Sequence, residues 1–492
     1  MRTTARARRA AVLAAVTAVA AAACGAIPST SPVRDQDFSA ELTVPPLAES
    51  RVEDGVRVFE LTAQQGRTSF LPGTMTTTWG FDGSYLGPTL RAERGERVAV
   101  EVTNGLTEAT SVHWHGMHLP AEMDGGPHQP VEPGATWRPS WEIDQPAATL
   151  WYHPHPHGQT EEHVYRGLAG LFLLDDDASR AASLPSEYGV DDVPVIVQDK
   201  TLDEDGELDL DSDGNAVGLH GDLVMANGTV GAYHAVTTER VRLRLLNGST
   251  ARTYAFGFED RTFDLVGTDG GLLARPVRTD GVRLSPGERA EIVVEMRPGE
   301  TVRLRSADPD LGGVAAPFAF GGNDAFDVLE LRAAAELAPS PEPRWAHHDT
   351  GPDEAAATVT RTFELQDREI NGRRMDMSRI DETVTVGETE IWEVRNRHPV
   401  PHSFHVHDVQ FEVASIDGAQ PPPELAGRKD TIYLEPNRTY RLVMRFEDYA
   451  DPDVPYMYHC HMLLHEDEGM MGQFVVVEPG QEAGSPPAHH GH

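Results

Sequence analysis

Apolar and polar residues alternate over many short stretches of the chain, a pattern that predicts β-strands. One alternating stretch, Gly95–Asn104, recurs in similar form at residues 238–247 and 387–396. A second repeated segment, a turn followed by an alternating strand, begins at Pro133 and recurs at residues 286–291 and 436–441. Successive copies are roughly 150 residues apart, the length of one domain. Helical periodicity is scarce, so the chain is predicted to be all-β, with three antiparallel β-sandwich domains in series.

The repeats and the changes in composition between them set the predicted domain limits. We place the first domain at residues 40–178, the second at 190–335 and the third at 355–480. Residues 336–354 are rich in Ala, Pro and Glu and are predicted to be a linker. Residues 481–492 are polar and are predicted to be a disordered tail.

The first residues resemble an export signal. Four arginines lie between Arg2 and Arg9, and an apolar run of small residues follows from Ala10 to Ala23. That run is too short to span a bilayer stably. Residues 1–23 are therefore predicted to be a signal, with the adjacent arginines at 8 and 9 allowing a twin-arginine route. Cys24 is predicted to be lipidated, with 24–39 as a tether that anchors the protein to the outer face of the cytoplasmic membrane. A simple secretory signal with an incidental cysteine is the alternative.

Charge and cysteine content exclude two classes of protein. Lys plus Arg total 41 and Asp plus Glu total 78 among 492 residues, a net charge of −37. Nucleic-acid binding is excluded because phosphate contacts need a basic surface. A disulfide framework is excluded because the chain has only 2 cysteines. The acidic surface suits small cationic partners or serves solubility.

Histidine is concentrated in four short runs. They occupy residues 113–116, 151–158, 402–407 and 459–466, and each contains His-x-His. On a strand, residues i and i+2 point to the same face, so each pair aims two imidazoles at one place. Cys460 lies between His459 and His461 and is expected to point the opposite way. A strand of this kind touches two metal centres, one on each side.

The ligand types suggest what each centre holds. One Cys, two His and a weak Met form the ligand set of a mononuclear blue-copper site. Here that set is predicted to be His402, Cys460, His465 and axial Met470. Eight histidines remain to face a second cluster, enough for three more copper ions: His113, His115, His153, His155, His405, His407, His459 and His461.

These four runs, in this order, resemble the motifs of three-domain multicopper oxidases, the family of laccases, bilirubin oxidases and bacterial copper efflux oxidases. The resemblance implies three cupredoxin-like Greek-key domains and four copper ions, one of type 1, one of type 2 and two of type 3. It assigns the type 2 ion to His113 and His405. It assigns the type 3 pair to His115, His153, His155, His407, His459 and His461. Residues 198–200, 244–248, 370–372 and 375–377 are most similar to the copper efflux group.

Two carboxylates match proton carriers of the resembling enzymes. Asp124 corresponds to an acidic residue near the type 2 copper, and Glu466 follows the ligand His465 and corresponds to a proton donor on the cluster side. Carboxyl groups near reduced oxygen species act as general acids. The alternative for each is an ordinary surface carboxylate.

The expected function is oxidation of small reductants one electron at a time at His402, coupled to reduction of dioxygen to water. Phenols, aromatic amines and Cu(I) are the candidate reductants, and the protein is expected to be a monomer. A dedicated cuprous oxidase for copper resistance is the first alternative, although His398 and Val400 depart from that group, which has Asp and Met there. A copper-binding electron-transfer protein and a cell-envelope scaffold are the alternatives outside the enzyme class.

Overall fold

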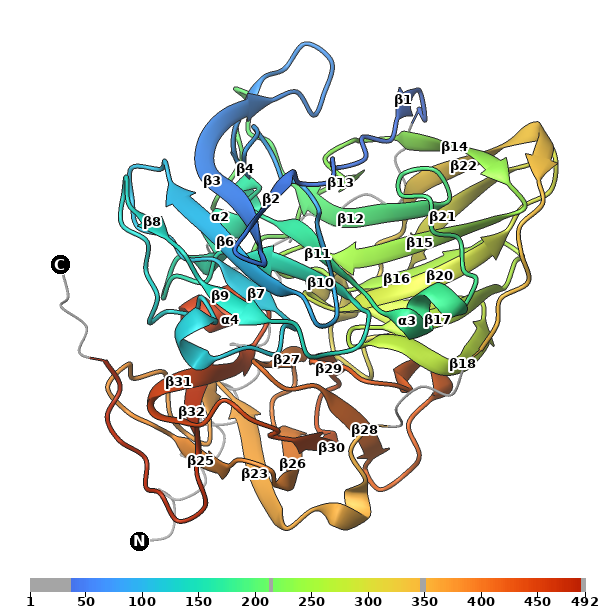
Figure 1. Ribbon diagram of the computed structural model, residues 1–492. Helices are drawn as coiled ribbons and strands as arrows, with labels where there is room; N and C mark the ends of the chain where they lie inside the picture. Colours follow the sequence, from blue (N-terminus) through green and yellow to red (C-terminus); the bar gives the residue numbers. More distant parts are fainter. Residues whose placement is uncertain (1–36, 212–215, 346–350, 488–492) are drawn as a thin grey trace, which may run out of the picture. The chain divides into compact units, whose positions relative to one another are not determined.

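The stretches that repeat in the sequence form corresponding strands in the computed structural model, which describes residues 37–211, 216–345 and 351–487 (Figure 1). The first repeated segment forms β6 (Arg97–Asn104), β15 (Arg240–Asn247) and β26 (Thr389–Asn396). The second becomes β8 (Thr136–Trp137), β20 (Arg289–Glu295) and β30 (Thr439–Arg445). In every domain the two strands are antiparallel neighbours. The all-β prediction is confirmed.

Domain 1, blue to teal in Figure 1, contains two sheets. The first has the order β2 (Ser50–Glu53), β3 (Val56–Thr68), β6 and β8, with β4 (Thr76–Phe81) paired to β3 and β9 (Ser140–Glu142) paired to β6. The second has the order β5 (Leu90–Glu93), β11 (Gly170–Asp175), β10 (Thr149–His153) and β7 (His113–His115). Its helices are η1 (Ala121–Met123), α2 (Thr160–Arg166) and α3 (Asp177–Ala181).

Domain 2, green to yellow, also contains two sheets. One has the order β13 (Leu223–Ala226), β12 (Asp192–Lys200), β15, β20, β17 (Phe263–Thr268) and β18 (Gly271–Thr279). The other has the order β1 (Ala40–Glu41), β14 (Ala232–Thr238), β22 (Phe326–Ala338), β21 (Thr301–Ala307), β16 (Tyr254–Phe258) and β19 (Gly281–Leu284), with helix η2 (Pro317–Phe320) nearby in sequence. Residues 40–41, predicted to begin domain 1, thus join a sheet of domain 2.

Domain 3, orange to red, repeats the arrangement. One sheet has the order β24 (Glu369–Ile370), β23 (Val359–Gln366), β26, β30 and β28 (Phe411–Ile416). The other has the order β25 (Glu382–Thr385), β32 (Met471–Val477), β31 (Asp451–Cys460), β27 (His402–Val406) and β29 (Thr431–Leu434). Its helices are η3 (Glu354–Ala356), η4 (Pro423–Leu425) and α4 (Leu463–Asp467).

Each domain has its own apolar core, to which both of its sheets contribute. In domain 3, for example, Trp392 of β26 and Phe404 of β27 belong to one buried cluster. Equivalent clusters fill domain 1 and domain 2. Alternate residues of each strand enter these cores, which is why the sequence alternates. The predicted sandwich architecture follows from this shared burial.

The sheets are mixed, and the prediction of purely antiparallel sheets was wrong. Each domain has a parallel pair in one sheet, β3 with β6, β12 with β15 and β23 with β26. Each has a second in the other sheet, β5 with β11, β14 with β22 and β25 with β32. Alternation reveals which face of a strand is buried, but not the direction of the neighbour, which here comes from far along the chain.

The predicted linker and tail are partly structured. β22 extends to Ala338, and the side chain of Trp345 packs against a small cluster of domain 2. In the tail, the amide of Gly484 donates to the carbonyl of Pro452. The predicted signal, Cys24 and most of the tether lie outside the described residues. In the part of the chain that is described, helices long and apolar enough to cross a membrane are absent.

Candidate metal centre

The predicted blue-copper ligands meet inside domain 3. β27 begins with His402, and β31 ends with Cys460. In the antiparallel ladder Cys460 lies opposite Phe404, two residues after His402. The short helix α4 then turns the chain back and returns His465 to the same place. Cys460 Sγ lies 3.5 Å from His402 Nδ1 and 3.4 Å from His465 Nδ1, and the two Nδ1 atoms are 3.1 Å apart. All three side chains are buried.

Met470 is held beside these residues by the backbone. Its amide donates to the carbonyl of His465 at 2.8 Å, and its carbonyl accepts from the amide of Cys460 at 3.0 Å. Its side chain is fully buried in the same apolar cluster as Cys460. This environment of one thiol, two Nδ1 atoms and a buried thioether suits a soft copper ion.

The other eight histidines gather between domains 1 and 3. His113 pairs with His153 across β7 and β10, and His405 pairs with His459 across β27 and β31. Rings from the two domains stack directly. The ring centroids of His113 and His407 are 3.8 Å apart, and those of His115 and His405 are 3.7 Å apart. All eight are buried. Only β7 contains both members of its His-x-His pair; in the other three runs the second histidine lies just beyond the strand end.

Hydrogen bonding fixes the direction of most of these rings. A neutral imidazole donates from one nitrogen and accepts at the other. In five of the rings Nδ1 is hydrogen-bonded to an oxygen 2.7 to 3.2 Å away: His113, His153, His405, His407 and His459. In His155 the nearest carboxylate oxygen, of Glu466, is 3.3 Å from Nδ1. An N–H at Nδ1 leaves the lone pair of Nε2 directed into the cluster.

The inward nitrogens crowd one another in a way that a cation would satisfy. Nε2 of His459 lies 3.2 Å from Nε2 of His155 and 3.2 Å from Nε2 of His407. Burial lowers the pKa of His155 to about 3 and lowers the pKa of His407 well below its usual value, so extra protons are disfavoured there. Ring nitrogens that converge at this distance suit a shared cation, and these imidazoles fit copper.

A second triplet lies on the other side of the cluster. His115 Nδ1 is 3.4 Å from His153 Nε2. The ring of His461 lies 4.9 Å from that of His115 and 5.2 Å from that of His153, and neither of its nitrogens has a hydrogen-bond partner among the described residues. The structure thus brings all eight of these histidines together in one buried cluster.

Asp124 and Glu466 lie behind the ligand rings. Asp124 Oδ2 accepts from His407 Nδ1 at 2.7 Å, and its Oδ1 is 3.3 Å from His113 Nδ1. Glu466 Oε2 is 3.1 Å from His459 Nδ1. Burial alone would raise the pKa of Glu466, but the neighbouring imidazoles hold it well below the usual range. Both carboxylates are buried, so neither is an ordinary surface group.

Sequence reasoning missed Asp430 and Thr431. Thr431 begins β29 opposite His405, and Asp430 Oδ1 lies 3.0 Å from His115 Nε2. Thr431 Oγ1 is within 3.1 Å of ring nitrogens of both histidines. The spacing of these two residues in the sequence does not indicate a role at the cluster. Their place beside the histidines follows only from the register of β29 against β27.

Two groups cover the blue-copper candidate on its outer side. The ring of His398 stacks on His402 with centroids 5.7 Å apart, and its Nε2 is 3.2 Å from the exposed carboxylate of Asp367. Arg368 Nη1 lies 2.7 Å from His465 Nε2. His402 is itself fully buried.

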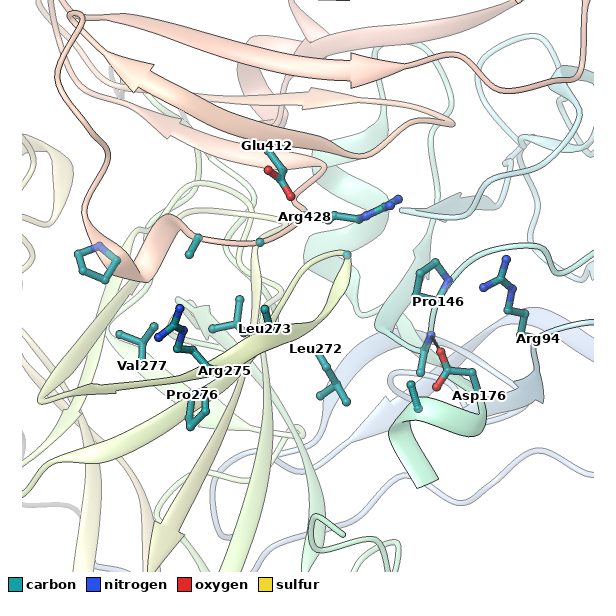
Figure 2. A pocket seen from close by; sticks show the side chains of 17 residues that line it. Arg94, Pro146, Asp176, Leu272, Leu273, Arg275, Pro276, Val277, Glu412 and Arg428 are labelled. Atoms are coloured by element: carbon teal, nitrogen blue, oxygen red, sulfur yellow. Dashed lines mark hydrogen bonds between the residues drawn. The ribbon is translucent and has the colours of Figure 1, made fainter. Parts of the chain in front are cut away.

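A cleft of about 540 Å³ lies apart from both centres. Figure 2 shows Pro146 of domain 1, Leu272 of domain 2 and Glu412 of domain 3 on its walls. None of the residues that line it is a predicted copper ligand.

Comparisons with known proteins agree with this geometry. Multicopper oxidase family models match residues 62–179, 192–303 and 348–480. The multicopper oxidase mco of Staphylococcus haemolyticus is 34% identical over 447 residues, 89% of this chain and 92% of the relative. The cell division protein FtsP of Escherichia coli is 35% identical over 461 residues, 92% of this chain and 95% of the relative.

Solved structures match over a similar length. The bacterial laccase-like multicopper oxidase CueO from Ochrobactrum sp. superposes with a TM-score of 0.81 at 34% identity, covering 89% of this chain and 100% of that one. A metallo-oxidase from Campylobacter jejuni gives 0.79 at 28% identity, covering 92% and 98%. Taken with the family models, these likenesses show that the chain belongs to the multicopper oxidase family.

Proposed function

We propose that this protein is an exported oxidase that takes single electrons from small reductants and reduces dioxygen to water. One observation carries the proposal: Cys460 faces the first centre while its covalent neighbours His459 and His461 face the second. Electrons that enter beside the thiolate have a short covalent route into the eight-histidine cluster. We further propose that the chain acts as a monomer tethered through a lipid on Cys24.

Copper held by these residues would supply one-electron redox chemistry toward dioxygen. The protein holds the ligands in place and keeps water out, since all twelve predicted ligand side chains are buried. Asp124 accepts from His407 Nδ1, and carboxylate oxygens of Asp124 and Glu466 lie within 3.3 Å of the outward nitrogens of three further cluster histidines, His113, His155 and His459. We assign to the same carboxylates the delivery of protons for water formation.

Reductants are proposed to dock over His398 and Arg368, which cover the blue-copper ligands. The imidazole of His398 and the guanidinium of Arg368 present flat faces that suit phenols and aromatic amines. A dedicated cuprous oxidase is the second candidate, favoured by the metallo-oxidase from Campylobacter jejuni among the structural relatives. His398 weighs against it, because its Nε2 is engaged by Asp367.

A scaffold without enzymatic activity is the candidate from another class, favoured by the likeness to FtsP. An intact set of buried ligands with inward-facing lone pairs supports the oxidase instead. A protein that only binds partners has no need of a cysteine flanked by two metal-facing histidines.

Oxygen uptake by the copper-loaded protein tests the proposal. Cu(I) and a methoxyphenol serve as reductants, the phenol with and without added Cu(II). Phenol oxidation independent of added copper supports a laccase-type enzyme, whereas a strong Cu(I) rate with copper-dependent phenol oxidation supports a cuprous oxidase. Absence of uptake with both reductants would refute the oxidase and leave the scaffold and electron-transfer candidates.

A further inference from the structure

None of the predicted copper ligands lies in domain 2, yet an arginine of that domain contacts Asp430, which borders the histidine cluster. Arg289 begins β20 and is fully buried. Its five N–H groups all have acceptors: the carbonyls of Thr149, Gly287 and Asp269, and both carboxylate oxygens of Asp430. Thr149 belongs to domain 1, in the strand that ends at a ligand, and Asp430 belongs to domain 3. One guanidinium therefore joins all three domains.

Asp430 links Arg289 to the histidine cluster. Arg289 Nη1 and Nη2 donate to its two oxygens at 2.6 and 2.7 Å, a bidentate pair of fixed geometry. The same Oδ1 lies 3.0 Å from His115 Nε2. His115 differs from the five rings hydrogen-bonded at Nδ1: its outward atom is Nε2, and Nδ1 faces His153.

We propose that Arg289 is a positioning residue that, through Asp430, fixes the ring direction of His115 for copper. This inference rests on the proposed function. A carboxylate at Nε2 keeps the proton on that atom and leaves Nδ1 free as a ligand. Without the guanidinium, Asp430 is a buried anion that has lost its counterion and its bidentate anchor, so it no longer holds His115 in one orientation.

Gly116 provides independent evidence that the ion pair of Arg289 and Asp430 packs closely against the strand that contains His115. A Cβ at this position would lie 2.5 Å from Asp430 Oδ2 and 2.7 Å from Arg289 Nη2. Its φ of 84° also lies in the region that favours glycine. The residue after His115 therefore gives Arg289 and Asp430 room to approach the backbone of the ligand itself.

The test compares Arg289→Lys with the matched control Arg244→Lys. Arg244 is also buried in domain 2 and also donates to Thr149, at Oγ1, and its other hydrogen bonds go to Asp192 and Glu291, neither of them a predicted ligand. Both variants keep the charge and lose a buried guanidinium, so both lose stability. Purified full-length proteins are loaded with copper and dialysed against a chelator. Copper per chain, the blue thiolate absorption and the near-ultraviolet absorption of the type 3 pair are then measured.

Arg289→Lys is expected to retain the cluster copper about 10- to 100-fold less tightly than Arg244→Lys, with the blue absorption per chain equal in both. Equal retention in the two variants would overturn the inference. If the wild-type protein shows neither absorption, the proposed function fails, and this inference fails with it.

A second variant covers the case in which Arg289→Lys does not fold. Asp430→Asn keeps the size of the side chain and removes the carboxylate, and it should show the same selective loss. Where both single variants fold, the double variant should lose no more cluster copper than Asp430→Asn alone, because the arginine acts through the aspartate. Additive losses, or full retention in Asp430→Asn, would overturn the inference.

Discussion

Replacing Asp124 by Asn should slow dioxygen reduction by about 10- to 150-fold while leaving the blue absorption unchanged. The carboxylate accepts a hydrogen bond from His407 Nδ1 at 2.7 Å and lies 3.3 Å from His113 Nδ1. A buried hydrogen bond to a charged group is worth about 1.5–3 kcal/mol. Because about 1.4 kcal/mol corresponds to tenfold, loss of this bond gives the range stated. The blue-copper candidates lie on other elements and do not contact Asp124, so their absorption should persist.

The assay separates the two halves of the reaction. The variant is reduced without oxygen and mixed with dissolved oxygen, and the return of the blue absorption is timed. Glu122→Gln is the matched control, because Glu122 lies two residues away but is exposed. It should reoxidise at the wild-type rate. Reoxidation of Asp124→Asn at that same rate would refute the reasoning, and loss of its blue absorption would show that the change spreads beyond the cluster.

Three other perturbations probe separate parts of the molecule. Cys460→Ser should abolish the blue absorption and oxygen uptake while copper analysis still finds the cluster ions, since the thiolate belongs to one centre only. Arg368→Ala should lower the reduction potential of the blue centre in a redox titration, because a positive charge 2.7 Å from His465 Nε2 favours the reduced ion. Burial alone would raise the pKa of Glu291, but its paired arginines lower it to about 2 from 4.5. The ion pairs therefore stabilise the fold above pH 4.5 and are lost as pH falls toward 2, so Glu291→Gln should remove roughly 3 kcal/mol of acid-dependent unfolding free energy, measured in urea.

The ligand runs could be predicted because their signal is local. Two imidazoles at i and i+2 converge wherever the chain is extended, and this holds even for His407 and His461, which lie just beyond their strands. The same rule placed Cys460 against a different centre from its neighbours. The positions of the strands could be predicted equally well, because the alternation of apolar and polar residues shows which side chains enter a core.

Contacts between domains could not be predicted in this way. Asp430 is 315 residues from His115, and Arg289 reaches Asp430 from the domain without predicted ligands. Their meeting depends on how three sandwiches pack, which no periodicity within one strand encodes. The parallel pairing of strands was missed for the same reason, since it depends on partners from distant parts of the chain.

Overall similarity does not distinguish an oxidase from a scaffold in this family. This chain is 34% identical to a named multicopper oxidase and 35% identical to a named cell division protein, over almost the same length. The decision therefore falls to individual side chains. Nε2 of buried His459 lies 3.2 Å from Nε2 of His155 and of His407, an arrangement that a shared cation would stabilise. The oxidase proposal accounts for this arrangement, whereas a scaffold role gives no reason for it.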